Sequence, residues 1–144
     1  MGRISSVPSK PPTVVDLAWK DGLRFASSSN SPNSSITIDG DSQSGPSPVQ
    51  TLAFALAGCM SVDVVHVLTK GRHPLRALSA QLIGHRAQDD PHRFVRIELH
   101  FTVEGAVPAE ATARAISLSR EKYCSVWHSM RQDIDFRVTF DTVA

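Results

Sequence analysis

Residues 45–70 read GPSPVQTLAFALAGCMSVDVVHVLTK and form the longest apolar stretch of the 144-residue chain. Their apolar side chains recur at spacings of three and four, which predicts an α-helix that begins near Pro48 with Ser47 as its N-cap. Because polar side chains are few, this helix should be surrounded by protein on most of its sides. Asp63 and His66 interrupt the apolar run, so no membrane span is expected.

The segments on either side of this helix have the patterns of strands and of one further helix. Before it, residues 13–27 predict a hairpin that turns at Lys20-Asp21-Gly22, and residues 36–38 a short third strand. After it, strands are expected over residues 75–87, 94–103 and 134–140, with a helix over 109–123 and one more helical turn after residue 124. This order predicts an α+β fold with antiparallel sheets packed around the long helix.

The bulk composition narrows the class of protein. A chain of 144 residues fits one domain, expected over residues 13–144, after a flexible, proline-containing N-terminal arm of residues 1–12. A net charge of +1 without a concentrated basic segment argues against binding to nucleic acid. The first residues contain neither a signal peptide nor an apolar anchor, so we expect a cytoplasmic protein without a membrane partner.

The apolar helix also indicates an oligomer. A helix that is apolar on nearly all sides needs two covering layers, and 144 residues with short strands supply about one. A homodimer in which both copies of the helix are buried would supply the second layer.

Cys59 and Cys124 lie 65 positions apart in the sequence. In the cytoplasm such thiols are normally reduced, so the pair indicates either inert packing or redox chemistry. Neither cysteine belongs to a CxxC motif or a close Cys/His cluster, and neither a metal nor another cofactor is expected. Ala57 and Gly58 precede Cys59 and leave room for a ligand to approach its sulfur.

The residues GPSPVQTLAFALAGCMSVDVV, followed from residue 119 by SREKYCSV, resemble the two cysteine motifs of the OsmC/Ohr family of hydroperoxide-resistance proteins. The WKDGLRF hairpin and the FVRIELHFTVEG strand agree with that family as well. The resemblance implies an OsmC-like fold in a swapped homodimer, with the cysteine helices at its centre and two active sites at the interface.

The resemblance also implies a role for each cysteine. Cys59 matches the peroxidatic cysteine, which a peroxide oxidises to a sulfenic acid, and Cys124 matches the resolving cysteine, which then forms a disulfide with it. A dithiol reductant, in the family often a lipoylated protein, would restore both thiols. Leu56 and Met60 are expected to provide apolar walls that suit an organic hydroperoxide as substrate.

One position departs from the better-studied family members. There a glutamate nine or ten residues before the first cysteine orients an arginine that lowers the thiol pKa, but this chain has Gln50 and Val49 at those positions. Arg24 takes the place of that arginine in the first hairpin, with Lys20 as the second candidate. Without the carboxylate, Arg24 is expected to be loosely held.

Asp63 lies one helical turn beyond Cys59. A buried carboxylate must be paired or protonated, and we expect a structural role in which a cation from a second copy or from Arg24 satisfies it. Two functions stay open at this point. Both cysteines favour a thiol-dependent peroxidase, whereas the missing glutamate favours a non-enzymatic dimer that binds a small apolar ligand at its interface.

Overall fold

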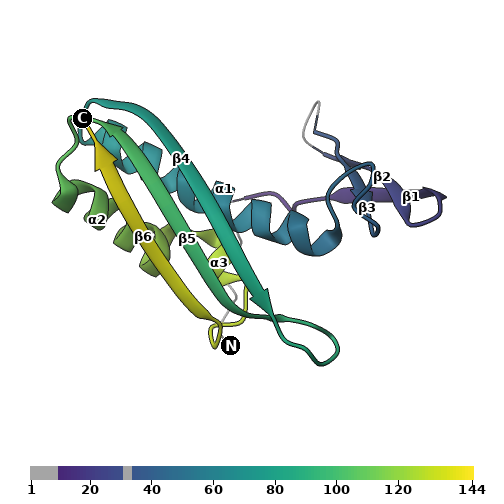
Figure 1. Ribbon diagram of the computed structural model, residues 1–144. Helices are drawn as coiled ribbons and strands as arrows, with labels where there is room; N and C mark the ends of the chain where they lie inside the picture. The colour runs from purple at the N-terminus through teal and green to yellow at the C-terminus, as the bar shows by residue number, and fades with distance from the viewer. Residues whose placement is uncertain (1–9, 31–33) are drawn as a thin grey trace, which may run out of the picture. The chain divides into compact units, whose positions relative to one another are not determined.

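The computed structural model describes residues 10–30 and 34–144 (Figure 1). The chain divides into two compact units, Met1–Thr51 and Leu52–Ala144. Most of the expected N-terminal arm, residues 1–9, lies outside the described residues, as do residues 31–33 of the loop that follows the hairpin. The single domain expected over residues 13–144 stays a prediction.

The first unit is a three-stranded antiparallel sheet in the order β1-β2-β3. Its strands are β1 (Val15–Asp21), β2 (Arg24–Ser29) and β3 (Thr37–Asp39). Gly22 turns the hairpin at φ +49°, a left-handed conformation that glycine adopts without strain. The indole N–H of Trp19 donates a hydrogen bond to the Gly22 carbonyl at 2.9 Å and closes the same turn. The predicted hairpin and short third strand are confirmed.

Helix α1 spans Pro48–Lys70, as the periodicity predicts. Its first turn is closed by a capping box, in which Ser47 Oγ accepts from the Gln50 N–H at 3.1 Å and Gln50 Oε1 accepts from the Ser47 N–H at 2.9 Å. The Ser42 hydroxyl donates to the same Gln50 oxygen at 3.1 Å. Ser47 is therefore confirmed as the N-cap, and Gln50 has a local structural role.

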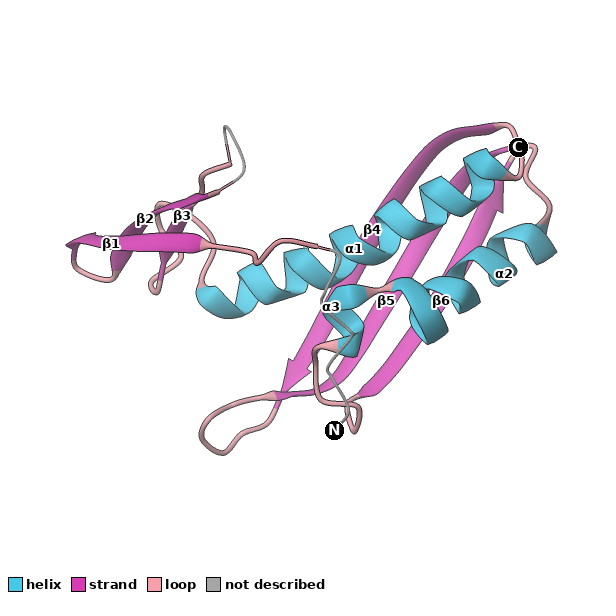
Figure 2. Ribbon diagram, turned by 180° about the vertical axis from the view of Figure 1, so that it is seen from behind, coloured by secondary structure: helices cyan, strands magenta, loops and turns pink. Residues whose placement is uncertain are grey.

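The second unit places a three-stranded sheet against helices on one of its faces, which Figure 2 shows from the helical side. Its strands, in the order β4-β5-β6, are β4 (Leu75–Arg86), β5 (Phe94–Gly105) and β6 (Asp135–Val143). Its helical segments after α1 are α2 (Ala109–Leu118), the π-helical turn η1 (Ser119–Tyr123) and α3 (Ser125–His128). The mixed α+β class is confirmed.

The expectation of purely antiparallel sheets is wrong for one strand pair. β4 and β5 are antiparallel, but β6 runs parallel to β5, with Ile97 opposite Phe136 and Phe101 opposite Phe140. Parallel neighbours need a crossover of a dozen or more residues, usually helical. Residues 106–134, which contain α2, η1 and α3, provide this crossover. They return the chain to the end of the sheet at which β5 begins, so that β6 can run parallel to β5.

The core of the second unit lies between α1 and the sheet. One row of α1 and alternate residues of β5 are fully buried there, in agreement with the predicted alternation of β5. These residues are Leu56, Met60, Val64 and Leu68 of α1, and Ile97, Leu99, Phe101 and Val103 of β5. Burial of apolar area of this kind is the main stabilising contribution to a fold.

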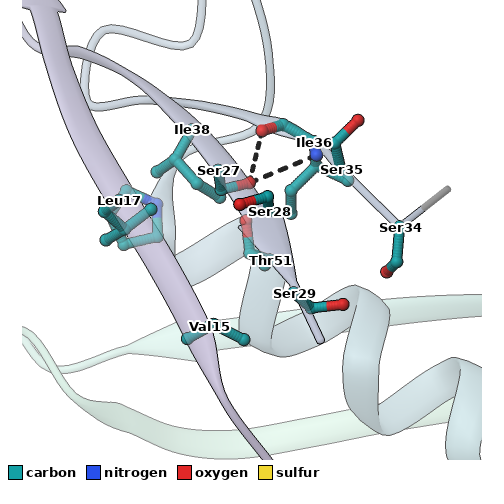
Figure 3. Close-up of a pocket in the computed structure, with 11 residues that line it drawn as sticks. Val15, Leu17, Ser27, Ser28, Ser29, Ser34, Ser35, Ile36, Ile38 and Thr51 are labelled. Atoms are coloured by element: carbon teal, nitrogen blue, oxygen red, sulfur yellow. Dashed lines mark hydrogen bonds between the residues drawn. The ribbon is translucent and has the colours of Figure 1, made fainter. Parts of the chain in front are cut away.

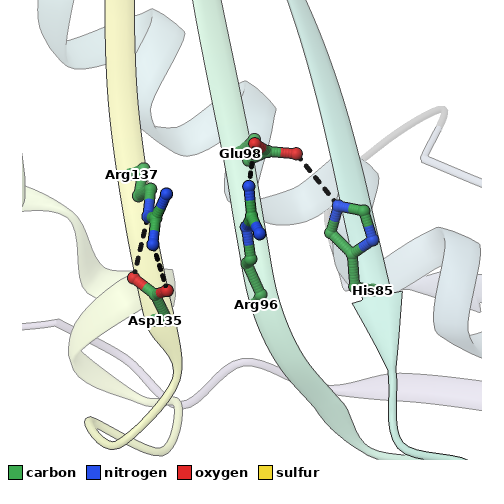
Figure 4. Close-up of polar contacts among 5 residues, drawn as sticks. All are labelled: His85, Arg96, Glu98, Asp135 and Arg137. Carbon is green, nitrogen blue, oxygen red and sulfur yellow. Dashed lines mark hydrogen bonds and ion pairs between the residues drawn. The ribbon is translucent and has the colours of Figure 1, made fainter.

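The opposite face of the sheet carries charged side chains (Figure 4). Glu98 accepts from His85 at 2.9 Å and from Arg96 at 2.7 Å, and these contacts, His85 first, lower the pKa of the Glu98 carboxyl. On β6, Arg137 pairs with Asp135 at 2.9 Å. Exposed pairs of this kind contribute little to stability, so the face is a solvated surface.

The remaining sides of α1 are exposed in the single chain. Phe54 and Val62 are 70% and 68% exposed, and Leu52 and Val65 are exposed as well. Of the helices in the described part of the chain, α1 alone is long and apolar enough to cross a membrane by length and composition. Core helices pass the same test, and the buried row of α1 packs against the sheet. The single chain therefore does not cover α1 on most of its sides, and a further layer of protein is needed for the cover that the sequence predicts.

A candidate redox site of two cysteines

The second unit brings the two cysteines together next to Asp63. Cys59 lies in the middle of α1, and Cys124 lies between η1 and α3. The two Sγ atoms and one carboxylate oxygen of Asp63 all lie within 4.8 Å of one another. Both cysteines are free thiols in this structure. Two thiols at this separation can form a disulfide after small side-chain rotations, because the bond needs an S–S distance of about 2.05 Å.

The end of the π-helical turn sets the position of Cys124. Its N–H donates to the Ser119 carbonyl at 2.8 Å, a bond that spans five residues, and its backbone is then extended at φ −73° and ψ 99°. The Cys124 sulfur accepts from the Trp127 N–H at 3.3 Å and so caps α3. Backbone bonds on both sides therefore hold this sulfur in place, and π-turns of this kind are frequent at functional sites.

The two thiols differ in their exposure. Cys124 is fully buried, whereas Cys59 is only partly buried and is open to small molecules. Burial raises the pKa of the Cys124 thiol to about 11, against the opposing effect of the Trp127 N–H. Cys124 is therefore a neutral thiol near pH 7. Access favours Cys59 as the thiol that an external oxidant meets first.

The raised pKa of Cys124 predicts a loss of stability in alkali. In the unfolded chain this thiol ionises near 9.0, and in the folded protein near 11, so folding favours its protonated form. The stabilisation is fully present below pH 9 and is lost as the pH rises through 11, with a total change of about 2 to 3 kcal/mol. Urea unfolding of reduced protein in metal-free buffer, compared with Cys124→Ala across this range, measures it. Parallel pH curves for the two proteins would contradict the assignment.

The carboxylate of Asp63 has a partner that the sequence did not suggest. The Ser119 hydroxyl donates to Asp63 Oδ2 at 2.6 Å, and Ser119 is fully buried. Asp63 has no ion pair with any described residue of its own chain, so its partner there is a hydroxyl and not the expected cation. Ser119 is 56 positions away and belongs to the second cysteine motif, but no spacing rule links the two residues.

Arg24 has a carboxylate partner within the first unit, but the pair is exposed to solvent, so the expectation of a loosely held arginine stays a prediction. Its guanidinium makes a bidentate ion pair with Asp21, at 2.6 Å from Nε to Oδ1 and 2.5 Å from Nη2 to Oδ2, and it donates to Ser44 Oγ at 3.3 Å. The hydrogen bond from Arg24 lowers the pKa of the Asp21 carboxyl. Asp21 is thus a carboxylate partner of Arg24 that lies on the same hairpin. Activation of Cys59 by Arg24, or by the exposed Lys20, stays a prediction.

Asp39 organises the loop that carries Ser44. This carboxylate is 2% exposed and accepts backbone N–H groups from Ser44 at 2.9 Å, Asp41 at 2.9 Å and Gln43 at 3.1 Å. These bonds, the one from Ser44 first, lower the pKa of Asp39. The sequence did not predict this role of Asp39, because such a nest of amides depends on the folded loop.

The two residues expected to line a substrate site, Leu56 and Met60, are fully buried in the core of the second unit. Both belong to the α1 row that packs on the sheet, one on each side of Cys59 in sequence. Their contact with a substrate stays a prediction.

The chain is similar to known proteins in its sequence and in its fold. The family model of the OsmC-like protein matches residues 40–139. Protein YhfA of Escherichia coli (strain K12) is 37% identical over 130 residues, which cover 89% of this chain and 96% of YhfA. A hypothetical protein from Aquifex aeolicus VF5 has a TM-score of 0.84 at 26% identity, over 92% of this chain and 97% of that one.

A third similar protein has a described role. The organic hydroperoxide resistance protein OsmC from Legionella pneumophila has a TM-score of 0.69 at 13% identity, over 93% of this chain and 99% of that one, and so shares the fold. The family model covers more than two thirds of the chain and includes both cysteines. This chain belongs to the OsmC-like protein family.

Proposed function

We propose that this protein is a thiol-dependent peroxidase that reduces organic hydroperoxides. The observation that carries the proposal is the placement of Cys59 and Cys124 with their sulfur atoms within 4.8 Å, one partly exposed and one buried. Solved structures that share the fold include a protein named for organic hydroperoxide resistance. Cytosolic thiol pairs at such a separation are typical of redox chemistry.

In the first step Cys59 acts as the nucleophile. Its thiolate attacks the terminal oxygen of the hydroperoxide, the O–O bond breaks, and the alkoxide leaves as an alcohol after it takes up a proton. The Cys59 thiolate loses two electrons and becomes a sulfenic acid. The hydroperoxide gains these two electrons and is reduced to the alcohol. The partial exposure of Cys59 gives the peroxide access to this sulfur.

In the second step Cys124 resolves the sulfenic acid. Its sulfur attacks the Cys59 sulfur, the S–S bond forms, and the S–O bond breaks with loss of water, which takes up the Cys124 proton. The high pKa of Cys124 keeps it as an unreactive thiol until the sulfenic acid forms beside it. A dithiol reductant, such as a lipoylated protein, then exchanges with the disulfide and restores both thiols.

The proposal includes a cation near Cys59, because a neighbouring positive charge favours the thiolate that attacks the peroxide. We assign this role to Arg24, whose guanidinium pairs with Asp21. Lys20, on the same hairpin, is the alternative.

A homodimer is part of the same proposal. The apolar side chains of α1 that are exposed in the single chain, Phe54 and Val62 foremost, form a surface that soluble monomers rarely leave open. A second copy of α1 against this surface would bury it and complete the cover of the helix that the sequence predicts. The dimer would also place further residues beside Cys59.

The experiment that tests the proposal is a count of free thiols. Reduced protein is treated with one equivalent of cumene hydroperoxide, and free thiols and intact mass are measured at short times. We expect both thiols to be lost together, with a mass decrease of about two hydrogens that reflects a Cys59–Cys124 disulfide. Digestion without reduction then identifies the linked peptides.

Two unchanged thiols after this treatment would contradict the peroxidase and favour a second function. The first unit contains an apolar pocket of about 430 Å³, drawn in Figure 3, which is large enough for a small molecule. Val15, Leu17, Ile36 and Ile38 line it together with serine hydroxyls, of which Ser27 hydrogen-bonds both the carbonyl and the N–H of Ile36. This pocket favours the non-enzymatic binding of a small apolar ligand as the alternative function.

A further inference from the structure

We propose that the reduced site also binds a thiophilic divalent metal ion of the zinc type, with Cys59, Cys124 and Asp63 as its three protein ligands. The two sulfur atoms and one carboxylate oxygen converge on a single point from two helical segments of the second unit. The sequence predicted no metal, because the cysteines are 65 positions apart and lack ligand spacing. The fold, and not the spacing, assembles the set.

The separations of the ligand atoms suit such an ion after small movements. A tetrahedral site with zinc–sulfur bonds of about 2.3 Å places its sulfur atoms about 3.8 Å apart. The three atoms here lie within 4.8 Å of one another, so contraction by about 1 Å or less is required. Rotation of side chains supplies movements of this size, and the backbone of α1 can stay where it is.

Neighbouring groups orient two of the three ligands. Ser119 donates to Asp63 Oδ2 at 2.6 Å and fixes one carboxylate oxygen, which leaves the other lone pairs of the carboxylate to a metal. The Trp127 N–H donates to the Cys124 sulfur at 3.3 Å, a contact that stabilises a metal-bound thiolate as well as a thiol. Ser119 is fully buried and Trp127 nearly so, so both donors are fixed in position by packing.

The charges at the site indicate that its ligand is a cation. Once both thiols are deprotonated, the three side chains carry three negative charges, and Asp63 has no ion pair with any described residue of its own chain. A divalent cation offsets two of these three negative charges and deprotonates the thiols as it binds. Partial exposure of Cys59 leaves a path for the ion and a fourth position for water.

The metal site and the disulfide exclude each other. Oxidation of the metal-bound thiolates by one hydroperoxide, with uptake of two protons, gives the disulfide, one alcohol, one water and the free divalent ion. Binding of the ion therefore opposes formation of the disulfide, and oxidation to the disulfide releases the ion. This inference needs reduced thiols in place, but it does not depend on peroxidase activity.

Binding of cobalt(II) to the reduced, full-length protein tests the inference, because cobalt(II) reports sulfur ligands and tetrahedral geometry by its absorption. We expect one equivalent to produce sulfur-to-cobalt charge-transfer and tetrahedral d–d bands, which zinc(II) abolishes. Cys59→Ser and Cys124→Ser should each lose the charge-transfer band or reduce it by about half. Asp63→Asn should weaken binding by more than tenfold and Ser119→Ala by about tenfold. Asp89→Asn, which changes an exposed carboxylate, serves as the matched control and should bind like the wild type.

Three results would overturn the metal site: no charge-transfer band with wild-type protein, an octahedral spectrum only, or equal affinity in Asp63→Asn and Asp89→Asn. The thiol count of each variant before the titration shows that the cysteines are reduced, and circular dichroism shows that the variant is folded. Cobalt binding is measured without peroxide, so a protein that binds the ion but consumes no hydroperoxide would support this inference while contradicting the proposed function.

Discussion

Replacement of Cys59 with serine is expected to abolish the consumption of organic hydroperoxide, with a loss in rate of about a thousandfold or more. A serine hydroxyl at the same place is hardly ionised at neutral pH and cannot form a sulfenic acid. The first step of the reaction, the attack on the hydroperoxide, is therefore blocked. The measurement is the disappearance of cumene hydroperoxide with dithiothreitol as the dithiol reductant. Partial exposure of Cys59 makes it the sulfur that the peroxide reaches.

The matched control is Cys124→Ser, which removes the other thiol of the same pair. This variant should still reduce one equivalent of hydroperoxide per chain, because the first step needs only Cys59, and the sulfenic acid should be captured by dimedone with the corresponding mass increase. Turnover that persists in Cys59→Ser at more than a tenth of the wild-type rate would contradict the assignment. Reduction of the first equivalent by Cys59→Ser but not by Cys124→Ser would assign the attacking thiol to Cys124.

The sequence was sufficient to predict the elements whose patterns are long. The dense apolar periodicity that follows Pro48 predicted α1 with its first residue correct, and the strand pattern over residues 94–103 predicted most of β5. Ser47 was identifiable as the N-cap because capping depends on the nearest few residues. These signals depend on residues that are close in sequence and not on the tertiary structure, so they were reliable.

Features that depend on the tertiary arrangement could not be predicted from spacing. The parallel direction of β6 depends on the path of the crossover after β5, and an alternating strand reads the same in either direction. The hydrogen bond between Ser119 and Asp63 joins residues 56 positions apart, and a serine has many alternative partners. The cysteines could be paired from the sequence only through the resemblance of their motifs to a known family.

The carboxylate partner of Arg24 was missed because only the positions before Cys59 were considered. Better-studied family members have a glutamate at the position of Val49 or Gln50, and its absence here suggested that Arg24 has no carboxylate partner. Asp21, however, pairs with Arg24 from the other side of the hairpin turn. Gln50 meanwhile serves the capping box of α1. A search for carboxylates three residues from Arg24 would have found Asp21, because a tight turn brings such residues together.

Replacement of Val62 with arginine is expected to convert the protein from a dimer to a monomer. Val62 is 68% exposed on α1 in the single chain, on the apolar surface that we propose a second copy covers. A charge in such an interface costs about 2 kcal/mol per copy, and twofold symmetry places it there twice, so the dimer should weaken by about a thousandfold. Light scattering coupled to size-exclusion chromatography measures the molar mass at several protein concentrations.

Ala113→Arg is the matched control, because Ala113 is exposed on α2 and has polar neighbours in the sequence. This variant should stay a dimer. A monomeric wild-type protein, or a Val62→Arg variant that stays dimeric at low micromolar concentration, would contradict the assigned interface. If the dimer places residues beside Cys59, the monomeric variant should also consume hydroperoxide more slowly, although both thiols belong to the same chain. Unchanged turnover in a monomer would instead show that one chain contains the complete redox site.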